Sequence, residues 1–222
     1  MDGVFITGTD TNVGKTTFSA GLLRMLHGSK PVTYWKPVQT GTMIGDDTNE
    51  VRALSKIDDA KAIIDPTYRF TDPVSPHFAA KKWGKRIDVG QIMATYERER
   101  KAGRFLLIEG AGGLLVPLND KELLLDLILL MKLPLIICTV DRVGAINQTL
   151  LTLNACKKAS VDVLGVVVTR SRGTLGNSEA IAEFGKVEIL AEFPPVDDMT
   201  SMMAMVATNP RLRELFQLAP LP

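Results

Sequence analysis

The chain has 222 residues, and because globular domains typically contain about 100 to 150 residues, this length corresponds to one large domain. Hydrophobic residues make up 45% of the chain and charged residues 23%, and this near-average composition excludes a disordered or collagen-like protein. The 26 basic and 25 acidic residues give a net charge of +1, which argues against a nucleic-acid partner because neutralising phosphates requires a surplus of Lys and Arg.

The cysteines and the apolar segments indicate the compartment. Cys138 and Cys156 are too few for a disulfide framework or a four-ligand zinc site, and each lies in an apolar stretch typical of a buried, reduced thiol. The first ten residues lack the basic and apolar regions of a signal peptide, and the most apolar stretch, 123–140, is interrupted by two charged residues and a proline. We therefore expect a cytoplasmic protein without a membrane span.

Short apolar runs alternate with helical patterns along the chain. Such alternation predicts an α/β fold, a three-layer αβα sandwich with a mostly parallel central sheet, here as a single domain over residues 1–222. Several runs consist almost entirely of Val, Ile and Leu, which is typical of strands buried on both faces. In chain order, strands are expected at 3–7, 31–36, 104–109, 134–140, 163–169 and 187–193.

The segments between the strands predict helices and one long loop. Hydrophobic residues recur at helical spacing over 16–26 and 145–159, so both segments should be core-facing helices. Segment 121–132 is apolar all round except for one aspartate, which indicates either burial on both sides, the alternative we favour, or a contact with another subunit. Residues 40–80 have an irregular pattern typical of a functional loop. The Met-rich segment from residue 199 predicts an apolar helix, either in the core or at a dimer contact.

A phosphate-binding loop follows the first predicted strand. Residues 8–17, GTDTNVGKTT, are a variant of the P-loop pattern GxxxxGK[ST] in which Thr9 replaces the first glycine. Gly14 allows the backbone to approach an anion, while successive amides and the helix N-terminus supply partial positive charge. Lys15 can reach the terminal phosphates, and the Thr16 hydroxyl can hold magnesium. A Gly-rich turn capped by Thr is the alternative, but the strand before the loop and the helix after it favour phosphate binding.

Charged residues at or after the ends of the following strands are expected at the same edge of the sheet. Ligands collect at the carboxyl ends of parallel strands, so Glu109 should face this crevice, where a carboxylate is a natural magnesium ligand. Lys36 is either a solvated surface lysine or a group that stabilises charge on a transferred phosphoryl group. Asp46 and Asp47 lie in the long loop, where Asp47, followed by Thr48, can cap a helix, bind metal or do both.

Two further motifs are less specific. The SPH sequence at 75–77 is typical of a helix start, with His77 more often structural than catalytic. In DRVGAINQT, residues 141–149, Gly144 precedes a predicted helix. The free amides at this helix start could bind a carboxylate, and they belong to Ala145, Ile146 and Asn147.

Taken together, GTDTNVGKT, YWKPVQTG, SPH, IEGAGG followed by VPL, and GAIN resemble the dethiobiotin synthetase family over about residues 3–196. The resemblance implies a homodimeric ligase of biotin biosynthesis that uses ATP and Mg²⁺. In that family 7,8-diaminopelargonate (7,8-diaminononanoate) and CO2 form an N-carbamate, ATP phosphorylates it to a carbamic-phosphoric anhydride, and the second amine closes the ring to give dethiobiotin, ADP and phosphate. Positioning and charge neutralisation suffice for this chemistry.

The resemblance also assigns site residues position by position. The implied catalytic residues are Lys15, Lys36 and Thr11, and the implied magnesium ligands are Thr16, Asp47 and Glu109, with Asp46 as the alternative to Asp47. The implied substrate-binding residues are Thr11, Lys36, Thr40 and, across the dimer interface, the helix start formed by Gly144, Ala145, Ile146 and Asn147. The implied nucleotide-binding residues are Asp10, Thr11, Asn12, Val13, Gly14, Lys15, Thr16, Thr17, Glu109, Gly112, Thr169, Arg170, Pro194 and Val196. The chain departs from the family at Thr169, where relatives often have an Asn that recognises adenine.

Three other functions remain open. A nucleotide-switch ATPase of the partitioning type would share the P-loop fold, but such proteins have a second lysine early in the loop, where this chain has Asp10. A small-molecule kinase would leave phosphate on its product and would not need bicarbonate. A nucleotide-binding module without catalysis does not explain why Lys36, Glu109 and a long loop surround one crevice.

Overall fold

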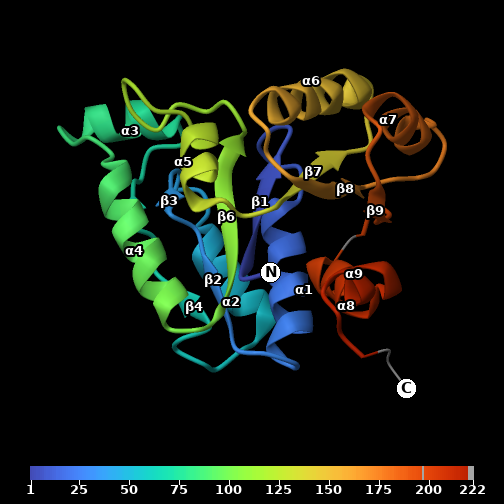
Figure 1. Ribbon diagram of the computed structural model, residues 1–222, viewed down its shortest axis with the longest axis horizontal. Helices are drawn as coiled ribbons and strands as arrows, with labels where there is room; N and C mark the ends of the chain where they lie inside the picture. Colours follow the sequence, from blue (N-terminus) through green and yellow to red (C-terminus); the bar gives the residue numbers. More distant parts are fainter. Residues whose placement is uncertain (197, 220–222) are drawn as a thin grey trace.

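The computed structural model describes residues 1–196 and 198–219. Within these residues a seven-stranded parallel sheet has the order β4-β2-β6-β1-β7-β8-β9 (Figure 1). Its strands are β1 (Gly3–Gly8), β2 (Val32–Trp35), β4 (Ile63–Ile64), β6 (Phe105–Gly113), β7 (Leu135–Val140), β8 (Val163–Thr169) and β9 (Ile189–Glu192). A separate parallel pair is formed by β3 (Val38–Gln39) and β5 (Tyr68–Arg69).

Helices cover both faces of the sheet, so the predicted three-layer sandwich is confirmed (Figure 1). One face packs against α1 (Lys15–His27), α2 (Asp47–Ser55), α8 (Met199–Thr208) and α9 (Pro210–Leu215). The other face packs against α3 (Pro76–Lys82), α4 (Val89–Lys101), α5 (Leu124–Met131), α6 (Ala145–Lys158) and α7 (Asn177–Gly185).

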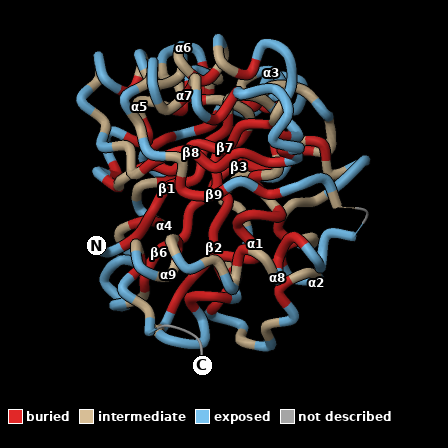
Figure 2. The backbone as a smooth tube through the Cα atoms, turned by 90° about the vertical axis from the view of Figure 1, so that its right-hand side faces the viewer, coloured by how far each residue is buried: buried red, intermediate tan, exposed pale blue. Residues whose placement is uncertain are grey.

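Alternation along the central strands divides the core into two clusters. On β1, Val4 and Ile6 belong to the cluster under α1, while Phe5 belongs to the cluster on the opposite face. The same division holds on β2, where Tyr34 faces α1 and Trp35 faces the other side. Successive strand side chains point to opposite faces of a sheet, so strands covered on both sides must be apolar at nearly every position. Figure 2 shows the resulting buried centre.

The predicted strands are all present, and the differences lie in the helices and the long loop. Segment 40–80 is not one irregular loop, because it contains the short strands β4 and β5 as well as α2 and α3. The favoured burial of segment 121–132 on both sides is wrong. Leu127 and Ile128 are buried, but Leu129 and Leu130 are 39% and 52% exposed, because α5 lies in an outer layer and packs through one face against β6 and α4.

The Met-rich segment forms a core helix. It becomes α8, which packs against α1 on one face of the sheet (Figure 1). Met202, Met203 and Val206 are buried in this contact. Among the residues that the structure describes, no helix combines the length and the apolar character that crossing a membrane would require.

Candidate active site

The P-loop joins the end of β1 to the start of α1. Gly14 caps α1 with a left-handed backbone (φ 85°), and a Cβ at this position would lie 2.9 Å from Cγ2 of Thr169. Glycine is therefore favoured both by the backbone angle and by the close approach of β8. Lys15 is buried, and its Nζ donates to the Asp10 carbonyl oxygen at 2.8 Å. The loop thus curls around the lysine that sequence analysis assigned to the phosphates.

The replacement of the first P-loop glycine by Thr9 is accommodated by the fold. The Thr9 hydroxyl shares a hydrogen bond with the Thr139 hydroxyl on β7 at 3.1 Å. The close approach occurs instead at Gly8, where a Cβ would lie 2.6 Å from Cγ2 of Val13 and 3.0 Å from Nζ of Lys15. Gly8 therefore provides the space that the loop needs, one residue before the usual position.

Four predicted residues meet behind the P-loop around a buried carboxylate. Oε1 of Glu109 accepts hydrogen bonds from Oγ1 of Thr16 and from Nζ of Lys36, each at 3.0 Å. Nζ of Lys36 also donates to Oδ2 of Asp47. These side chains come from α1, α2, the middle of β6 and the residue that follows β2, so the crossover connections of the parallel sheet bring them together.

Burial makes the charges of this cluster strongly dependent on one another. Lys36 is only 4% exposed and Glu109 is 0% exposed, so the interpretation of Lys36 as a solvated surface lysine is wrong. Burial opposes the charge of Lys36, but the carboxylates of Glu109 and Asp47 outweigh it and raise the pKa of Lys36 above its ordinary value. Burial, together with the charge of Lys36, lowers the pKa of Lys15. Lys36 is therefore firmly protonated, whereas the positive charge of the neighbouring Lys15 is less favourable.

Asp46 and Asp47 have different roles. Asp46 has an extended backbone, caps α2 by accepting a hydrogen bond from the Asn49 amide at 3.0 Å, and pairs with Arg69. Asp47 is the first residue of α2 and turns toward Lys36. The expectation that Asp47 caps the helix is therefore wrong, because an N-cap side chain must reach an amide in the first turn from outside the helix. Of the two aspartates, Asp47 lies at the site.

Tyr34 is a residue of the site that the sequence did not predict. Its hydroxyl donates to Oε2 of Glu109 at 3.1 Å, and the side chain is fully buried. Burial, reinforced by the charge of Glu109, raises the pKa of Tyr34 well above its ordinary value, so the phenol is a hydrogen-bond donor at neutral pH. The available signal was the spacing, since Tyr34 precedes Lys36 by two residues on β2 and its connection, and alternation directs both toward the same face.

A cavity of about 910 Å³ opens in front of this cluster. Its volume lies within the range of about 300 to 1,000 Å³ that is usual for small-molecule sites. The predicted residues that line it are Thr11, Asn12, Gly14, Lys15, Thr16, Thr17, Lys36, Thr40, Asp47, Glu109, Gly112 and Arg170. Residues that were not predicted also contribute, among them Gln39, Glu50 and Ser75.

Other predicted nucleotide-binding residues support the loop or lie outside the cavity lining. The buried Thr169 hydroxyl donates to the backbone oxygens of Val13 at 3.1 Å and Thr139 at 3.2 Å, so it holds the P-loop from behind. Asp10 pairs with Arg142 at 2.9 Å. Pro194 is exposed, and Val196 packs against the hydrophobic core.

The predicted carboxylate site at the start of α6 does not line the cavity of the same chain. Gly144 caps α6 with a φ of 90°, as expected for a glycine before a helix. The Ala145 amide donates to the Arg142 carbonyl oxygen at 3.0 Å, so the expectation that it is free is wrong. The tight turn before α6 occupies this amide. The predicted carboxylate site would therefore depend on the amides of Ile146 and Asn147.

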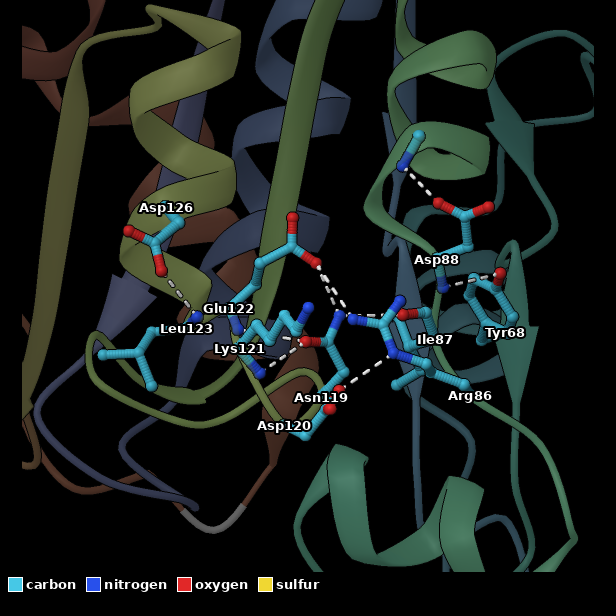
Figure 3. A network of polar contacts seen from close by, with 11 residues as sticks. Tyr68, Arg86, Ile87, Asp88, Asn119, Asp120, Lys121, Glu122, Leu123 and Asp126 are labelled. Atoms are coloured by element: carbon cyan, nitrogen blue, oxygen red, sulfur yellow. Dashed lines mark hydrogen bonds and ion pairs between the residues drawn. The ribbon is translucent and has the colours of Figure 1, made fainter.

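The SPH and VPL motifs meet at one wall of the cavity. SPH starts α3 at Pro76 as predicted, and the His77 amide donates to the carbonyl oxygen of Pro117, in the loop after β6, at 3.3 Å. Asn119 fixes the same loop, since its Nδ2 donates to the Ile87 carbonyl oxygen at 2.9 Å and its Oδ1 accepts from the Glu122 amide at 3.0 Å (Figure 3). These contacts hold the loop that follows Glu109 and Gly112 in place.

Comparisons with known proteins agree with this arrangement. A family model described as an AAA domain matches residues 2–203. An ATP-dependent dethiobiotin synthetase of Lawsonia intracellularis is 40% identical over 213 residues, which cover 96% of this chain and 98% of that protein. A protein of the same description from Paramagnetospirillum magneticum is 38% identical, with coverages of 90% and 92%.

Solved structures show the fold alone. The MinD cell division protein of Aquifex aeolicus superimposes with a TM-score of 0.62 over 100% of this chain and 99% of its own, but only 13% of the residues are identical. The sequence relatives are far more similar and match over nearly the whole chain, in agreement with the motifs that meet around the cavity. The chain belongs to the ATP-dependent dethiobiotin synthetase family.

Proposed function

We propose that this protein is a dethiobiotin synthetase, which carboxylates 7,8-diaminopelargonate and closes the ureido ring at the expense of ATP in biotin biosynthesis. The observation that carries the proposal is the cluster of Lys36, Glu109, Asp47 and Thr16 beside the P-loop, in one cavity large enough for a nucleotide and a small acid. The similarity to dethiobiotin synthetases over most of the chain supports the same substrates.

The P-loop residues would bind and orient the phosphates of ATP. Asn12, Gly14 and the N-terminus of α1 line the cavity, where their amides and partial positive charge would meet the phosphates. Lys15 lines the cavity and supplies a further positive charge. Because Lys15 already lies close to the buried Lys36, a bound phosphate would relieve the repulsion between the two ammonium groups.

Lys36 would neutralise charge between the carbamate and the γ-phosphate. Its two carboxylate partners keep it protonated, and it lines the cavity beside the P-loop. Thr11 and Thr40 lie on the same lining and would orient the carbamate through their hydroxyl groups. Phosphoryl transfer requires chiefly an in-line arrangement and neutralised charge, and this set would provide both without a covalent nucleophile.

Thr16, Asp47 and Glu109 would hold Mg²⁺. One hydroxyl and two carboxylates are the hard oxygen donors that Mg²⁺ prefers, and Mg²⁺ needs few protein ligands because it keeps several waters. The ammonium group of Lys36 joins Asp47 to Glu109, and this pairing of two carboxylates with one cation supports a metal site beside them. When bound, Mg²⁺ neutralises charge on the β- and γ-phosphates.

A homodimer would complete the substrate site. The start of α6, from Gly144 to Asn147, does not line the described cavity, so these residues could reach a substrate carboxylate only in a second copy of the chain. The outer faces of α5 and α6 expose Leu130 and Leu151, at 52% and 62%, and such apolar surface suits a subunit contact.

We place the enzyme in the cytoplasm, since both cysteines are free and buried.

The alternative is a nucleotide-switch ATPase, and the structural neighbours favour it by fold only. The discriminating residue is Asp10, which occupies the position of the second lysine of such proteins and pairs with Arg142. A switch would also have no use for Lys36 as a bridge between carboxylates at the edge of a substrate cavity.

Turnover assays would test the proposal. The purified protein is incubated with diaminopelargonate, bicarbonate, Mg²⁺ and each nucleoside triphosphate in turn, while phosphate release and the cyclised product are followed. We expect a product that depends on both diaminopelargonate and bicarbonate. Lys15→Met should abolish it, whereas Lys81→Met, on the exposed surface of α3, should retain full activity. Nucleotide hydrolysis that does not depend on diaminopelargonate would favour the switch ATPase, and a phosphorylated product formed without bicarbonate would favour a kinase.

A further inference from the structure

Tyr34 contacts Glu109 on the side away from the cavity. The Tyr34 hydroxyl donates to Oε2 at 3.1 Å, whereas Thr16 and Lys36 both donate to Oε1. Thr16, Lys36 and Glu109 line the cavity, but Tyr34 lies behind Glu109 and outside the described lining. The two oxygens of this carboxylate therefore have different partners, since Oε1 bonds two residues that line the cavity and Oε2 bonds a fully buried phenol.

The sheet fixes this arrangement. Parallel pairing places Tyr34 of β2 opposite Leu107 of β6, and Glu109 follows two residues later on the same face. The ring of Tyr34 is packed in the core under α1, so the hydroxyl group has little freedom to move away. By contrast, the flexible four-carbon stem of Lys36 allows its ammonium group to move from Glu109 to a phosphate.

We propose that Tyr34 is a positioning residue that holds Oε2 of Glu109, so that Oε1 is presented to the metal and to Lys36. The inference rests on the proposed function for the identity of the metal as Mg²⁺. Groups that orient a metal ligand fix its geometry, and their loss typically weakens metal binding by about 10- to 100-fold. When Lys36 turns to the phosphates, the Tyr34 hydroxyl remains as a fixed donor on the buried carboxylate.

Tyr34→Phe tests this role, and Tyr96→Phe is its matched control. Tyr96 is also buried, but its hydroxyl donates to the Met131 carbonyl oxygen at 2.9 Å, in the packing of α4 against α5. Binding of Mn²⁺ to the ADP complex is measured by electron paramagnetic resonance. We expect about tenfold weaker Mn²⁺ binding in Tyr34→Phe and no change in Tyr96→Phe.

Kinetics provide a second readout. Tyr34→Phe should raise the Mg²⁺ concentration needed for half-maximal turnover by about the same factor, while KM for diaminopelargonate stays within about twofold of the wild-type value. Equal Mn²⁺ affinity in wild type and Tyr34→Phe would overturn the inference, as would a lower Tm accompanied by unchanged metal binding, because the phenol would then serve packing alone.

A measurement on the unaltered chain covers the case in which Tyr34→Phe does not fold. The sequence has only three tyrosines, so labelling with 3-fluorotyrosine gives three ¹⁹F signals, which Tyr68→Phe and Tyr96→Phe assign. Addition of Mg²⁺ to the ADP complex should shift the Tyr34 signal and leave that of Tyr96 in place. An unmoved Tyr34 signal would refute the positioning role. The Mn²⁺-binding and ¹⁹F measurements do not need turnover, so a wild-type protein that forms no dethiobiotin would refute the proposed function separately.

Discussion

Replacing Lys36 with Met should destabilise the protein, because it removes the cation between two carboxylates and leaves the apolar part of the side chain. Glu109 is fully buried, and loss of one partner from a buried ion pair typically costs about 3 to 5 kcal/mol. Tyr34 and Thr16 still donate to Glu109, so we expect the lower end, about 3 kcal/mol. For a chain of this size that corresponds to a fall in Tm of about 6 to 12 °C.

Urea and thermal unfolding, followed by circular dichroism at pH 7 without nucleotide or Mg²⁺, measure this loss. The double variant Lys36→Met with Glu109→Gln should recover much of the stability, since it leaves no uncompensated buried charge. Lys81→Met is the control for loss of an exposed lysine and should remain within about 0.5 kcal/mol of wild type. The buried ion cluster does not exist in solution if Lys36→Met lowers the stability as little as Lys81→Met does. The same conclusion follows if the effects of Lys36→Met and Glu109→Gln on the free energy of unfolding simply add.

Three other predictions concern groups around the site. Burial, with the charges of Asp47 and Glu109, raises the pKa of Glu50, so its ionisation disfavours the folded state above the ordinary carboxyl pKa. Glu50→Gln should thus increase the urea midpoint at pH 7, and this gain should vanish as the pH falls below about 4.5; a gain that does not depend on pH would contradict the electrostatic cause. Burial raises the pKa of Cys138 to about 12 and that of Cys156 to about 11, so neither thiol should react with Ellman's reagent at pH 8 until the protein is unfolded, and rapid labelling of the native protein would show that a thiol is accessible. Thr169→Val removes the donor to the Val13 carbonyl oxygen and should lower the free energy of unfolding by about 1 kcal/mol in urea titrations, whereas an unchanged midpoint would mean that this hydrogen bond adds no net stability.

Local patterns were sufficient for the order of the elements. Strands buried on both faces must be apolar at nearly every position, so β6, β7 and β8 were visible in the sequence. The P-loop was visible because it needs glycine, lysine and a hydroxyl at fixed spacing between a strand and a helix. The residues of segment 40–80 were harder to place, since strands of two residues and short helices have too few positions to show a period.

The sequence motifs and the resemblance to a family supplied the candidate residues, but their places in the molecule came from the tertiary structure. It brought Thr16, Lys36, Asp47 and Glu109 together, whereas it left the start of α6 outside the cavity of the same chain.

The fold class and the phosphate-binding loop could be predicted from the sequence alone, because each leaves a pattern among residues that are close in the chain. The burial of Lys36, its contact with Asp47 and the support of Glu109 by Tyr34 emerge only in the folded chain. The physical reason is that the charge and hydrogen bonding of these groups depend on partners as many as 75 residues away, which no local pattern encodes.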